Sequence, residues 1–377
     1  MGSGMEKRYI ARFDIDVSLL GFGAMRLPLL PGSASAIDQV LTEAMVDRAL
    51  AEGVNYFDTA FTYHKGISEL LLGRILNKHP RESYFLADKL PLWTLKSRDE
   101  AEHMFKSQLK KCRVNYFDFY LLHGLNASLY ARAEQLGIYA WLREKKEQGL
   151  VRHIGFSFHD SPEVFRQILD EHTWNFAQIQ LNYVDWEACN AKWLYALLEE
   201  RGLPAVIMEP VRGGSLANLP AEADTLLKAA SGASPASWAI RYAASLPNVM
   251  VVLSGMSAMA HVEDNLATMK RFRPLSDDER AILQKAAAIY RASGDIPCTG
   301  CGYCSPCPHG VDIPGVFAAY NHRKRGDFAL VYRAIPPTAQ ATACECCGHC
   351  LKHCPQHIDI PARLHDVVGF IDGKHPA

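Results

Sequence analysis

The chain has 377 residues, of which 40 are Lys or Arg and 41 are Asp or Glu, so its formal net charge at pH 7 is -1. A chain of this length buries a large core, and its balanced charge excludes the electrostatic footprint of a protein that binds nucleic acid or an acidic membrane. The apolar runs are short and no signal sequence follows the N-terminus, so we expect a cytoplasmic protein without a membrane span.

Short apolar runs alternate along the chain with amphipathic segments, as in parallel strands joined by crossover helices. After a weak hairpin pattern over residues 8–17, the sequence predicts eight strands, at residues 18–23, 55–58, 83–89, 117–123, 153–157, 176–182, 205–208 and 249–254. The predicted helices cover residues 42–52, 68–77, 97–112, 136–147, 162–171, 191–201, 234–244 and 276–293. This repeat predicts an α/β fold, a (β/α)8 TIM barrel with its site at the carboxyl ends of the strands.

An open doubly wound sheet is the alternative fold. We disfavour it because no Gly-rich phosphate fingerprint follows the first strand, where Gly21 and Gly23 lead into Met25 and Arg26 and not into a helix. Beyond Gly294 the composition changes to Cys, Pro and His. The sequence therefore predicts two domains, a barrel at residues 5–293 and a second domain at residues 294–377.

Polar side chains that packing does not require stand near three predicted strand ends. Asp58 ends the second strand, Tyr63 lies on the loop after it, and Lys89 and His123 end the third and fourth strands. These groups suit the protonation of a carbonyl oxygen while hydride reaches its carbon. Tyr63 would exchange the proton, Lys89 would lower its pKa, Asp58 would hold Lys89, and His123 would orient the substrate oxygen.

The expected effect of Lys89 on Tyr63 follows from simple electrostatics. A depression of the tyrosine pKa by two units from its usual value of about 10 needs roughly 2.7 kcal/mol. Two unit charges about 4 Å apart at an effective dielectric near 20 supply ~4 kcal/mol. We therefore expect Lys89 alone to lower the pKa of Tyr63.

Three segments resemble the aldo-keto reductase superfamily. They are FDTAFTYHKGISELLLG, DKLP and FDFYLLHG, and the resemblance covers about residues 8–290. It implies a catalytic tetrad of Tyr63 as general acid/base, Lys89, Asp58 and His123. It also implies a nicotinamide dinucleotide bound without a Rossmann fold, usually NADP(H), with NAD(H) as the alternative, and a small carbonyl or alcohol substrate.

The resemblance further implies the cofactor contacts. Ser157 in HIGFSFHD and Gln178 in FAQIQLNYVD match the positions that bind the carboxamide. The positions that match the adenosine end lie in LSGMSAMAHVEDN and are Gly255, Met256, Ser257, His261, Asp264 and Asn265. Gly255 and His261 stand where basic residues often hold the 2′-phosphate, which leaves the choice between NADPH and NADH open.

Nine of the eleven cysteines lie between residues 298 and 354, in two runs that each end in Cys-Pro. Three thiolates at this spacing wrap one iron-sulfur cube, and the fourth, before proline, ligates the cube of the other run. The ligands expected for one [4Fe-4S] cluster are Cys298, Cys301, Cys304 and Cys354. Those expected for the second are Cys344, Cys347, Cys350 and Cys307. Cys346 is left over, and zinc is the less favoured metal because it prefers separated pairs of ligands.

The tail resembles helical two-cluster ferredoxins. Helix-like stretches at residues 315–322 and 327–333 separate the runs, and VDIPG and IDIPA follow the last cysteine of each run, which suggests an internal duplication. The whole chain is similar to aldo-keto reductases that carry a C-terminal, mainly α-helical ferredoxin-like domain. Metal binding and electron exchange with a redox partner protein are the expectations that follow.

Two functions remain open at this point. The first is an NAD(P)H-dependent oxidoreductase that interconverts a carbonyl and an alcohol, with two [4Fe-4S] clusters for electron transfer. Hydride carries two electrons, whereas each [4Fe-4S] cluster passes one at a time. The sequence has no motif for a flavin that could convert between the two, so structural or sensing roles for the clusters are alternatives. The second is an electron-transfer or redox-sensing protein whose barrel binds cofactor without carbonyl turnover.

Overall fold

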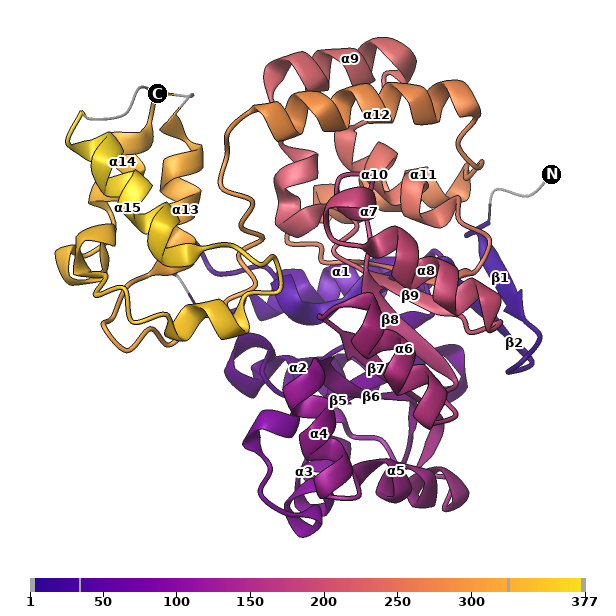
Figure 1. Cartoon of the computed structure of the whole chain (residues 1–377). Coiled ribbons are helices and arrows are strands. Elements are labelled where there is room, and N and C mark those ends of the chain that lie inside the picture. Colours follow the sequence, from indigo (N-terminus) through magenta and orange to yellow (C-terminus); the bar gives the residue numbers. More distant parts are fainter. Residues whose placement is uncertain (1–3, 34, 324–325, 374–377) are drawn as a thin grey trace. The chain divides into compact units, whose positions relative to one another are not determined.

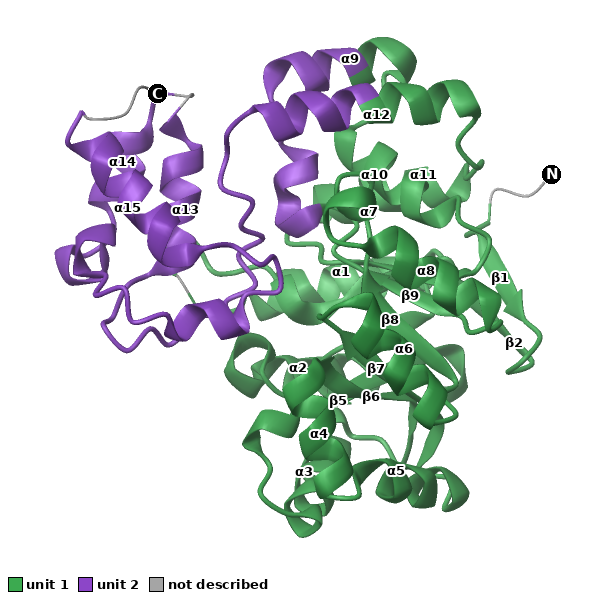
Figure 2. Ribbon diagram, in the orientation of Figure 1, with its two compact units in different colours: residues 1–211, 227–284 green, residues 212–226, 285–377 purple. Residues whose placement is uncertain are grey.

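The structure of the chain is a computed structural model that describes residues 4–33, 35–323 and 326–373. It divides into two compact units (Figure 2). Residues 1–211 and 227–284 form the first, the barrel unit, and residues 212–226 and 285–377 form the second, the cysteine unit. The boundary predicted at residue 294 lies inside the cysteine unit. This unit also includes residues 212–226, a separate segment that precedes the predicted boundary in the chain.

Eight parallel strands close a barrel in the order β10-β3-β4-β5-β6-β7-β8-β9 (Figure 1). Their bounds are β3 Leu20–Gly23, β4 Tyr56–Asp58, β5 Phe85–Leu90, β6 Phe117–Leu125, β7 Val151–Phe158, β8 Phe176–Gln180, β9 Ala205–Met208 and β10 Val249–Ser254. An antiparallel hairpin of β1 (Lys7–Ile10) and β2 (Ile15–Ser18) precedes them. The predicted eight-stranded α/β barrel is confirmed, and the open sheet is wrong.

Twelve helices accompany the strands within the described residues up to 292. They are α1 Gln39–Ala51, α2 Ile67–Leu76, α3 Arg98–Cys112, α4 Ala127–Gln135, α5 Ile138–Glu147, α6 Pro162–Glu171, α7 Asp185–Ala188, α8 Ala191–Glu200, α9 Ala221–Ser231, α10 Pro235–Ala244, α11 Met259–Lys270 and α12 Asp277–Ala292. The sequence prediction missed α4, α7, α9 and α11. Among the helices that the structure describes, none is long and apolar enough to span a membrane.

Local signals fix where several of these helices begin and how closely they pack. Ser97, Ser161 and Ser234 each cap a helix by accepting a hydrogen bond from a backbone N–H one turn on. Gly73 lets α2 lie against the end of α3, because a Cβ atom there would come within 2.3 Å of the Lys111 carbonyl oxygen. These features set the starts of α3, α6 and α10 and the close packing of α2 on α3.

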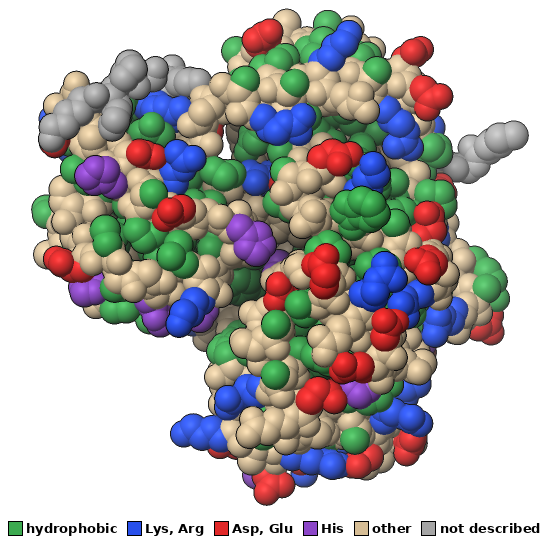
Figure 3. All heavy atoms as spheres, in the orientation of Figure 1, with side chains coloured by type: hydrophobic (Ala, Val, Ile, Leu, Met, Phe, Trp, Pro, Cys, Tyr) green, Lys and Arg blue, Asp and Glu red, His purple; other side chains and the backbone are tan. Residues whose placement is uncertain are grey.

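Charged side chains are mixed over the surface of the barrel unit. Figure 3 shows Lys and Arg interspersed with Asp and Glu on the face that it presents. Long-range ion pairs such as Arg48 with Glu263 and Arg201 with Asp170 follow the same mixing. This distribution agrees with the near-zero net charge.

His153 on β7 is partly buried between aromatic rings inside the barrel unit. Its imidazole lies 4.0 Å from the ring centre of Phe13 and 5.0 Å from that of Phe119. Burial, with smaller effects of Lys146 and Arg152, lowers the pKa of His153 to about 4. The unfolded chain therefore binds more protons than the folded chain between about pH 6.5 and pH 4, and folding loses stability as the pH falls through this window.

We expect His153→Phe, which keeps an aromatic ring without a titrating group, to reduce the acid lability of the barrel unit. Between pH 7 and pH 4.5 the wild type should lose about 2 to 3 kcal/mol of unfolding free energy that the variant keeps. Urea unfolding followed by tryptophan fluorescence measures this, because all six tryptophans lie in the barrel unit. His103→Phe, at an exposed position on α3, is the matched control and should leave the pH dependence unchanged.

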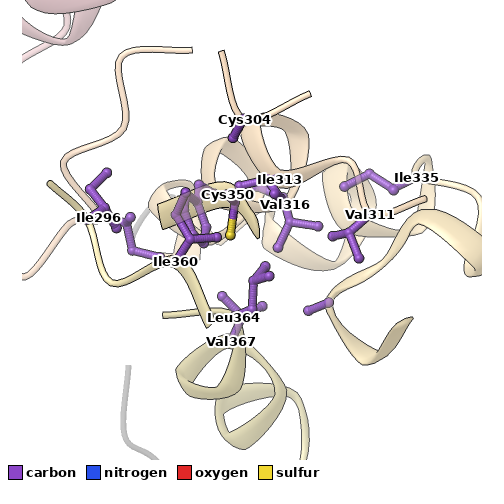
Figure 4. Packing of buried hydrophobic residues seen from close by; sticks show 14 of the residues in the cluster. Ile296, Cys304, Val311, Ile313, Val316, Ile335, Cys350, Ile360, Leu364 and Val367 are labelled. Atoms are coloured by element: carbon purple, nitrogen blue, oxygen red, sulfur yellow. The ribbon is translucent and has the colours of Figure 1, made fainter. Parts of the chain in front are cut away.

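The cysteine unit has its own apolar core around three helices (Figure 4). The helices are α13 Ile313–Asn321, α14 Phe328–Arg333 and α15 Ile360–Ile371. Val316 and Phe317 of α13 and Leu364 and Val367 of α15 are buried in this core. Cysteines from both runs border it, so the fold of the unit and the placement of the thiols depend on one another.

The two related segments VDIPG and IDIPA begin α13 and α15 in the same way. Asp312 accepts a hydrogen bond from the backbone N–H of Gly315, and Asp359 accepts one from that of Ala362, at 3.1 and 3.2 Å. A proline stands in the first turn of each helix, where its missing N–H costs nothing. The two halves of the tail therefore share one local construction.

Candidate functional site

The four candidate catalytic residues lie on neighbouring parts of the barrel unit. Asp58 ends β4, Lys89 is in β5 and His123 is in β6, and these three strands are adjacent in the barrel. Tyr63 begins the short helix η2, Tyr63–Gly66, that follows β4. The structure thus brings together, at the carboxyl ends of the strands, the four side chains that the sequence singled out.

Lys89 is the centre of this group and is fully buried. Its Nζ atom donates to Asp58 Oδ1 at 2.5 Å, to the backbone oxygen of Thr59 at 2.8 Å and to Tyr63 Oη at 3.3 Å. The same Nζ atom lies 4.9 Å from the centre of the Tyr63 ring. All three N–H donors of the ammonium are therefore directed at oxygen atoms, and Asp58 fixes the ammonium beside the phenol.

His123 and Trp93 complete the wall around Tyr63. The rings of Tyr63 and His123 meet edge to face, with centres 6.0 Å apart and an interplanar angle of 84°. Trp93, on the loop after β5, lies 5.1 Å from His123 and remains 42% exposed. A partly exposed indole beside these buried candidate residues is suited to contact a small molecule.

The expected lowering of the Tyr63 pKa is wrong. Burial raises the pKa of the phenol well above its ordinary value of 10.0, and the carboxylates of Asp58 and Glu209 raise it further. Arg26 opposes them. The calculation considered only the charge of Lys89. It failed because it left out the desolvation of the phenol and the carboxylates of Asp58 and Glu209, all of which favour the neutral phenol.

His123 is also held neutral. Burial lowers the pKa of its imidazole well below the ordinary value of 6.5, and the charge of Lys89 lowers it further. A neutral imidazole has one N–H donor and one acceptor nitrogen. At neutral pH the group can therefore donate a hydrogen bond to a substrate oxygen without adding a charge.

Glu209 was missed by the sequence analysis. It follows β9 in a left-handed backbone conformation, with φ of 56°, and forms an ion pair with Arg26 at 3.0 Å. Arg26 follows β3, the neighbour of β10 in the barrel, and Ser257 Oγ donates to its backbone oxygen at 2.7 Å. Only the closed barrel brings these segments together, because they are far apart in the sequence.

Ser157 and Gln178, the candidate carboxamide contacts, are paired residues of β7 and β8. Ser157 Oγ accepts from the backbone N–H of Gly124 at 2.7 Å, which leaves its hydroxyl hydrogen to donate elsewhere. Gln178 Nε2 contacts Met208 Sδ at 3.5 Å, whereas its buried Oε1 has no hydrogen-bond partner within the described part of the chain. A buried amide oxygen without a partner is costly, so a ligand donor at this point would stabilise it.

The candidate adenosine contacts fall into two groups. The backbone N–H of Ser257 donates to His261 Nδ1 at 3.2 Å, and these two side chains are exposed. Gly255 packs on the aliphatic part of Arg26. The others are engaged inside the barrel unit: Met256 is buried, Asp264 accepts from Ser234 at 2.6 Å, and Asn265 donates to Ser254 at 2.8 Å.

A buried polar network supports the backbone at Lys89. Gln108 of α3 donates to Glu69 Oε1 at 3.0 Å and to the Lys89 carbonyl oxygen at 2.9 Å, and its Oε1 accepts from Tyr120 at 2.5 Å. Gln108 is fully buried. One amide side chain therefore links α2, β5 and β6 directly behind Lys89.

We expect Gln108→Met, which keeps side-chain length but removes these hydrogen bonds, to lower the unfolding free energy by about 2 to 4 kcal/mol, because it leaves buried partners unsatisfied. Urea unfolding followed by tryptophan fluorescence measures the change. Gln167→Met, at an exposed position on α6 where the amide donates a hydrogen bond to Glu171, is the control and should change stability by less than about 0.5 kcal/mol. An equal effect of the two substitutions would contradict a supporting role for Gln108.

Eight cysteines of the cysteine unit line two cavities. The first cavity is lined by residues that include Cys298, Cys301, Cys304 and Cys354. The second is lined by residues that include Cys307, Cys344, Cys347 and Cys350. Each contains about 310 Å³ of atom-free space, part of it open to solvent, and Ile313 of α13 borders both. The thiols are thus divided into the same two sets of four as in the sequence analysis.

The arrangement of these thiols differs from that of a mononuclear metal site. Over residues 4–33, 35–323 and 326–373, no group of three or more His, Cys, Asp and Glu side chains is arranged to hold a single metal ion. Cys346, the ninth cysteine of the tail, is exposed and has a φ of 51°. The four cysteines of each set border a common space.

Known proteins are similar to this chain over the barrel part of the sequence. The sequence pattern described as "Aldo/keto reductase family" matches residues 19–288. L-galactose dehydrogenase of Arabidopsis thaliana is 27% identical over 306 residues, which are 76% of this chain and 94% of that protein. The match to the family pattern ends before the first cysteine of the tail.

Solved structures give the same result for the fold. The holo form of aldo-keto reductase AKR11C1 from Bacillus halodurans has a TM-score of 0.63 and 27% identity, and the match covers 76% of this chain and 98% of that one. An aldo/keto reductase from Klebsiella pneumoniae, solved in complex with NADP and acetate, has a TM-score of 0.60 and 20% identity over 72% of this chain and 92% of that one. At 20% identity the likeness concerns the fold alone.

Proposed function

We propose that this chain, which belongs to the aldo/keto reductase family, reduces a small carbonyl compound to an alcohol with Tyr63 as the proton donor. One observation carries the proposal: Tyr63, Lys89, Asp58 and His123 meet at the carboxyl ends of adjacent strands, and Lys89 bonds both Asp58 and Tyr63. Buried ionisable groups have no packing reason to converge at this rim.

The protonation states favour reduction. A phenol whose pKa is raised remains protonated at neutral pH and can give its proton to a carbonyl oxygen. The Lys89 ammonium then lies beside the oxygen that becomes negatively charged on Tyr63, and it stabilises that charge at the moment of transfer. His123, neutral and edge-on to Tyr63, donates a hydrogen bond that holds the substrate oxygen in line.

NADP(H) is the proposed cofactor, with NAD(H) as the alternative, and when bound it supplies hydride. The residues fit a nicotinamide carboxamide, because Gln178 Oε1 is a buried acceptor in need of a donor and Ser157 Oγ has a hydrogen to give to an acceptor. NADP is the cofactor in the Klebsiella pneumoniae structure. We propose Gly255, Ser257 and His261 for the adenosine end, with Met256, Asp264 and Asn265 as the side chains that hold this loop.

Two [4Fe-4S] clusters are the proposed occupants of the cysteine unit. The support is the division of eight thiols between two cavities, four to each, in the pattern expected when the last cysteine of each run serves the other run's cluster. Such clusters exchange single electrons. Thiolates of this kind persist in a reducing compartment, which agrees with the proposed cytoplasmic location.

An electron-transfer or redox-sensing role without carbonyl turnover is the second candidate function. The exposure of Cys346 and Cys347 beside the second cavity favours it, because a cluster there would lie near the surface, within reach of a redox partner or of oxygen. The tetrad favours turnover. The two functions make different predictions for the same assay.

The test uses the full chain, reconstituted anaerobically with iron and sulfide. Oxidation of NADPH and of NADH is measured with a panel of aldehydes and ketones and, separately, with a one-electron dye. Cys301→Ala and Cys347→Ala, each of which removes one proposed ligand, are assayed in parallel. Carbonyl reduction that survives in both variants supports the reductase function of the barrel. Dye reduction that is lost in both variants shows that electrons reach the dye through the clusters.

Absence of carbonyl reduction across the panel, combined with rapid dye reduction, would instead support the electron-transfer role. Gln178→Ala tests the cofactor site independently of turnover. It should weaken NADPH binding, measured by fluorescence titration, whereas Gln167→Ala on α6 should leave binding unchanged. Equal affinity of the two variants would contradict the carboxamide contact.

A further inference from the structure

A loop outside the cysteine-rich sequence packs against a residue that lines the first cavity. This loop, η5 (Arg212–Ala217), follows β9 in the chain and belongs to the cysteine unit. Gly213 has a φ of +65°, and a Cβ atom on it would lie 2.2 Å from the backbone oxygen of Thr299. Thr299 lines the first cavity between two of its cysteines. Only glycine fits at this backbone contact, so the loop packs directly against the backbone of a residue that lines the cavity.

Arg212, the first residue of this loop, places a guanidinium group behind Gln356, a residue that lines the cavity. It is buried, and its Nη2 atom donates at 3.3 Å to Oε1 of Gln356, which lines the first cavity. Its Nη1 atom donates to Tyr290 Oη at 3.3 Å, and Tyr290 in turn donates to Ser215 Oγ at 3.0 Å. Ser215 Oγ donates to the Arg212 carbonyl oxygen at 2.8 Å. These contacts hold the guanidinium one side chain away from the cavity.

The second cavity has different surroundings. Its lining includes Glu345 and His349, and both are exposed, as is the ligand candidate Cys347. The first cavity has no exposed cysteine among its four, and Thr299 beside them is buried. Two chemically identical clusters would therefore experience different fields.

We infer that the η5 loop completes the site of the first cluster and that Arg212 raises the reduction potential of that cluster alone. This inference rests on the proposed binding of two [4Fe-4S] clusters. The reduced cluster carries one more negative charge than the oxidised one, so a nearby buried cation stabilises the reduced form. Arg212 acts through its charge and through Gln356, and is a positioning residue and not a ligand.

The experiment is a potentiometric titration of the reconstituted full-length protein, followed by electron paramagnetic resonance. Iron and acid-labile sulfide are measured first in the wild type. A wild type without them overturns the proposed clusters and this inference with them, whereas in a wild type that holds both clusters the potentials test Arg212 alone. The titration wave that is lost in Cys301→Ala belongs to the first cluster, and the wave lost in Cys347→Ala belongs to the second.

Arg212→Gln should move the wave of the first cluster to a more negative potential and leave that of the second unchanged, with full iron content. Arg212→Lys, which keeps the charge, should stay near the wild type. Arg363→Gln is the matched control: it removes an arginine from the same unit, at an exposed ion pair with Asp366, and should move neither wave.

Gly213→Val provides a second test that does not depend on charge. Its side chain would overlap the Thr299 backbone, so the variant should lose the first cluster's signal and about half of the iron while the second signal remains. Unchanged potentials in Arg212→Gln, or equal shifts of both waves, would overturn the inference. Loss of all iron in both Arg212→Gln and Arg212→Lys would overturn it too, because Arg212 would then serve the folding of the whole unit.

Discussion

Replacing Tyr63 by Phe is expected to lower kcat for carbonyl reduction by about 10²- to 10⁴-fold, the range for loss of a positioned proton donor. The phenol oxygen is the one atom removed, and it is the atom that Lys89 contacts at 3.3 Å. Binding of NADPH should change little, because the proposed cofactor contacts lie on β7, β8 and after β10. Steady-state kinetics and a fluorescence titration of NADPH separate the two effects.

The pH dependence of the wild type follows from the same two groups. The raised pKa keeps Tyr63 protonated up to and beyond its ordinary value near 10, and the lowered pKa keeps His123 neutral above its ordinary value of 6.5. Both groups are thus in the form that reduction requires between about pH 6 and pH 9. We expect the rate of reduction to be flat over this range, and oxidation of the alcohol, which requires the phenolate, to rise with pH.

Tyr56→Phe is the matched control for Tyr63→Phe. Tyr56 is on β4, the strand that precedes Tyr63 in the chain, and is fully buried, and within the chain that the structure describes its hydroxyl oxygen has no hydrogen-bond partner. Loss of the Tyr56 hydroxyl group should leave kcat unchanged and should not reduce the free energy of unfolding. If Tyr63→Phe, like Tyr56→Phe, kept the wild-type kcat for carbonyl reduction, the assignment of Tyr63 as proton donor would be wrong.

The barrel could be predicted from the sequence because its strands are short apolar runs at regular spacing, with clear caps such as Ser97 and Ser161 on the helices between them. The missed helix α11 shows where this reasoning stops. Its N-cap residue is Ala258, which offers no side-chain oxygen, and its first turn has no acidic residue. Without these signals, residues 259–270 read as a loop.

That the four candidate catalytic residues lie close together could be predicted, but their protonation could not. Asp58, Tyr63, Lys89 and His123 each stand near a strand end, and parallel strands bring such ends together. The pKa of Tyr63 depends on complete burial and on Glu209, which lies far away in the sequence and takes a left-handed conformation. Neither could be read from local pattern, and together they reversed the expected direction of the shift.

Lys89→Met is expected to abolish most activity and to destabilise the barrel unit by about 3 to 5 kcal/mol, the usual result of removing one partner of a buried ion pair. The lysine is fully buried and Asp58 is 2% exposed, so the remaining carboxylate would have no cation and little water. Burial already raises the pKa of Asp58, and Lys89 is the group that opposes this shift. The variant should therefore lose stability most at pH values where Asp58 would otherwise be ionised.

The double variant Asp58→Asn, Lys89→Met separates stability from catalysis. Because it removes both charges, it should recover most of the unfolding free energy lost in Lys89→Met, while kcat stays at least about 10²-fold below the wild type. Urea unfolding by tryptophan fluorescence and steady-state kinetics on all four members of the cycle give the coupling energy of the pair. A double variant as unstable as Lys89→Met would show that lost packing and not the orphaned carboxylate causes the destabilisation. Recovery of activity together with stability would show that Lys89 serves only to neutralise Asp58 and does not assist Tyr63.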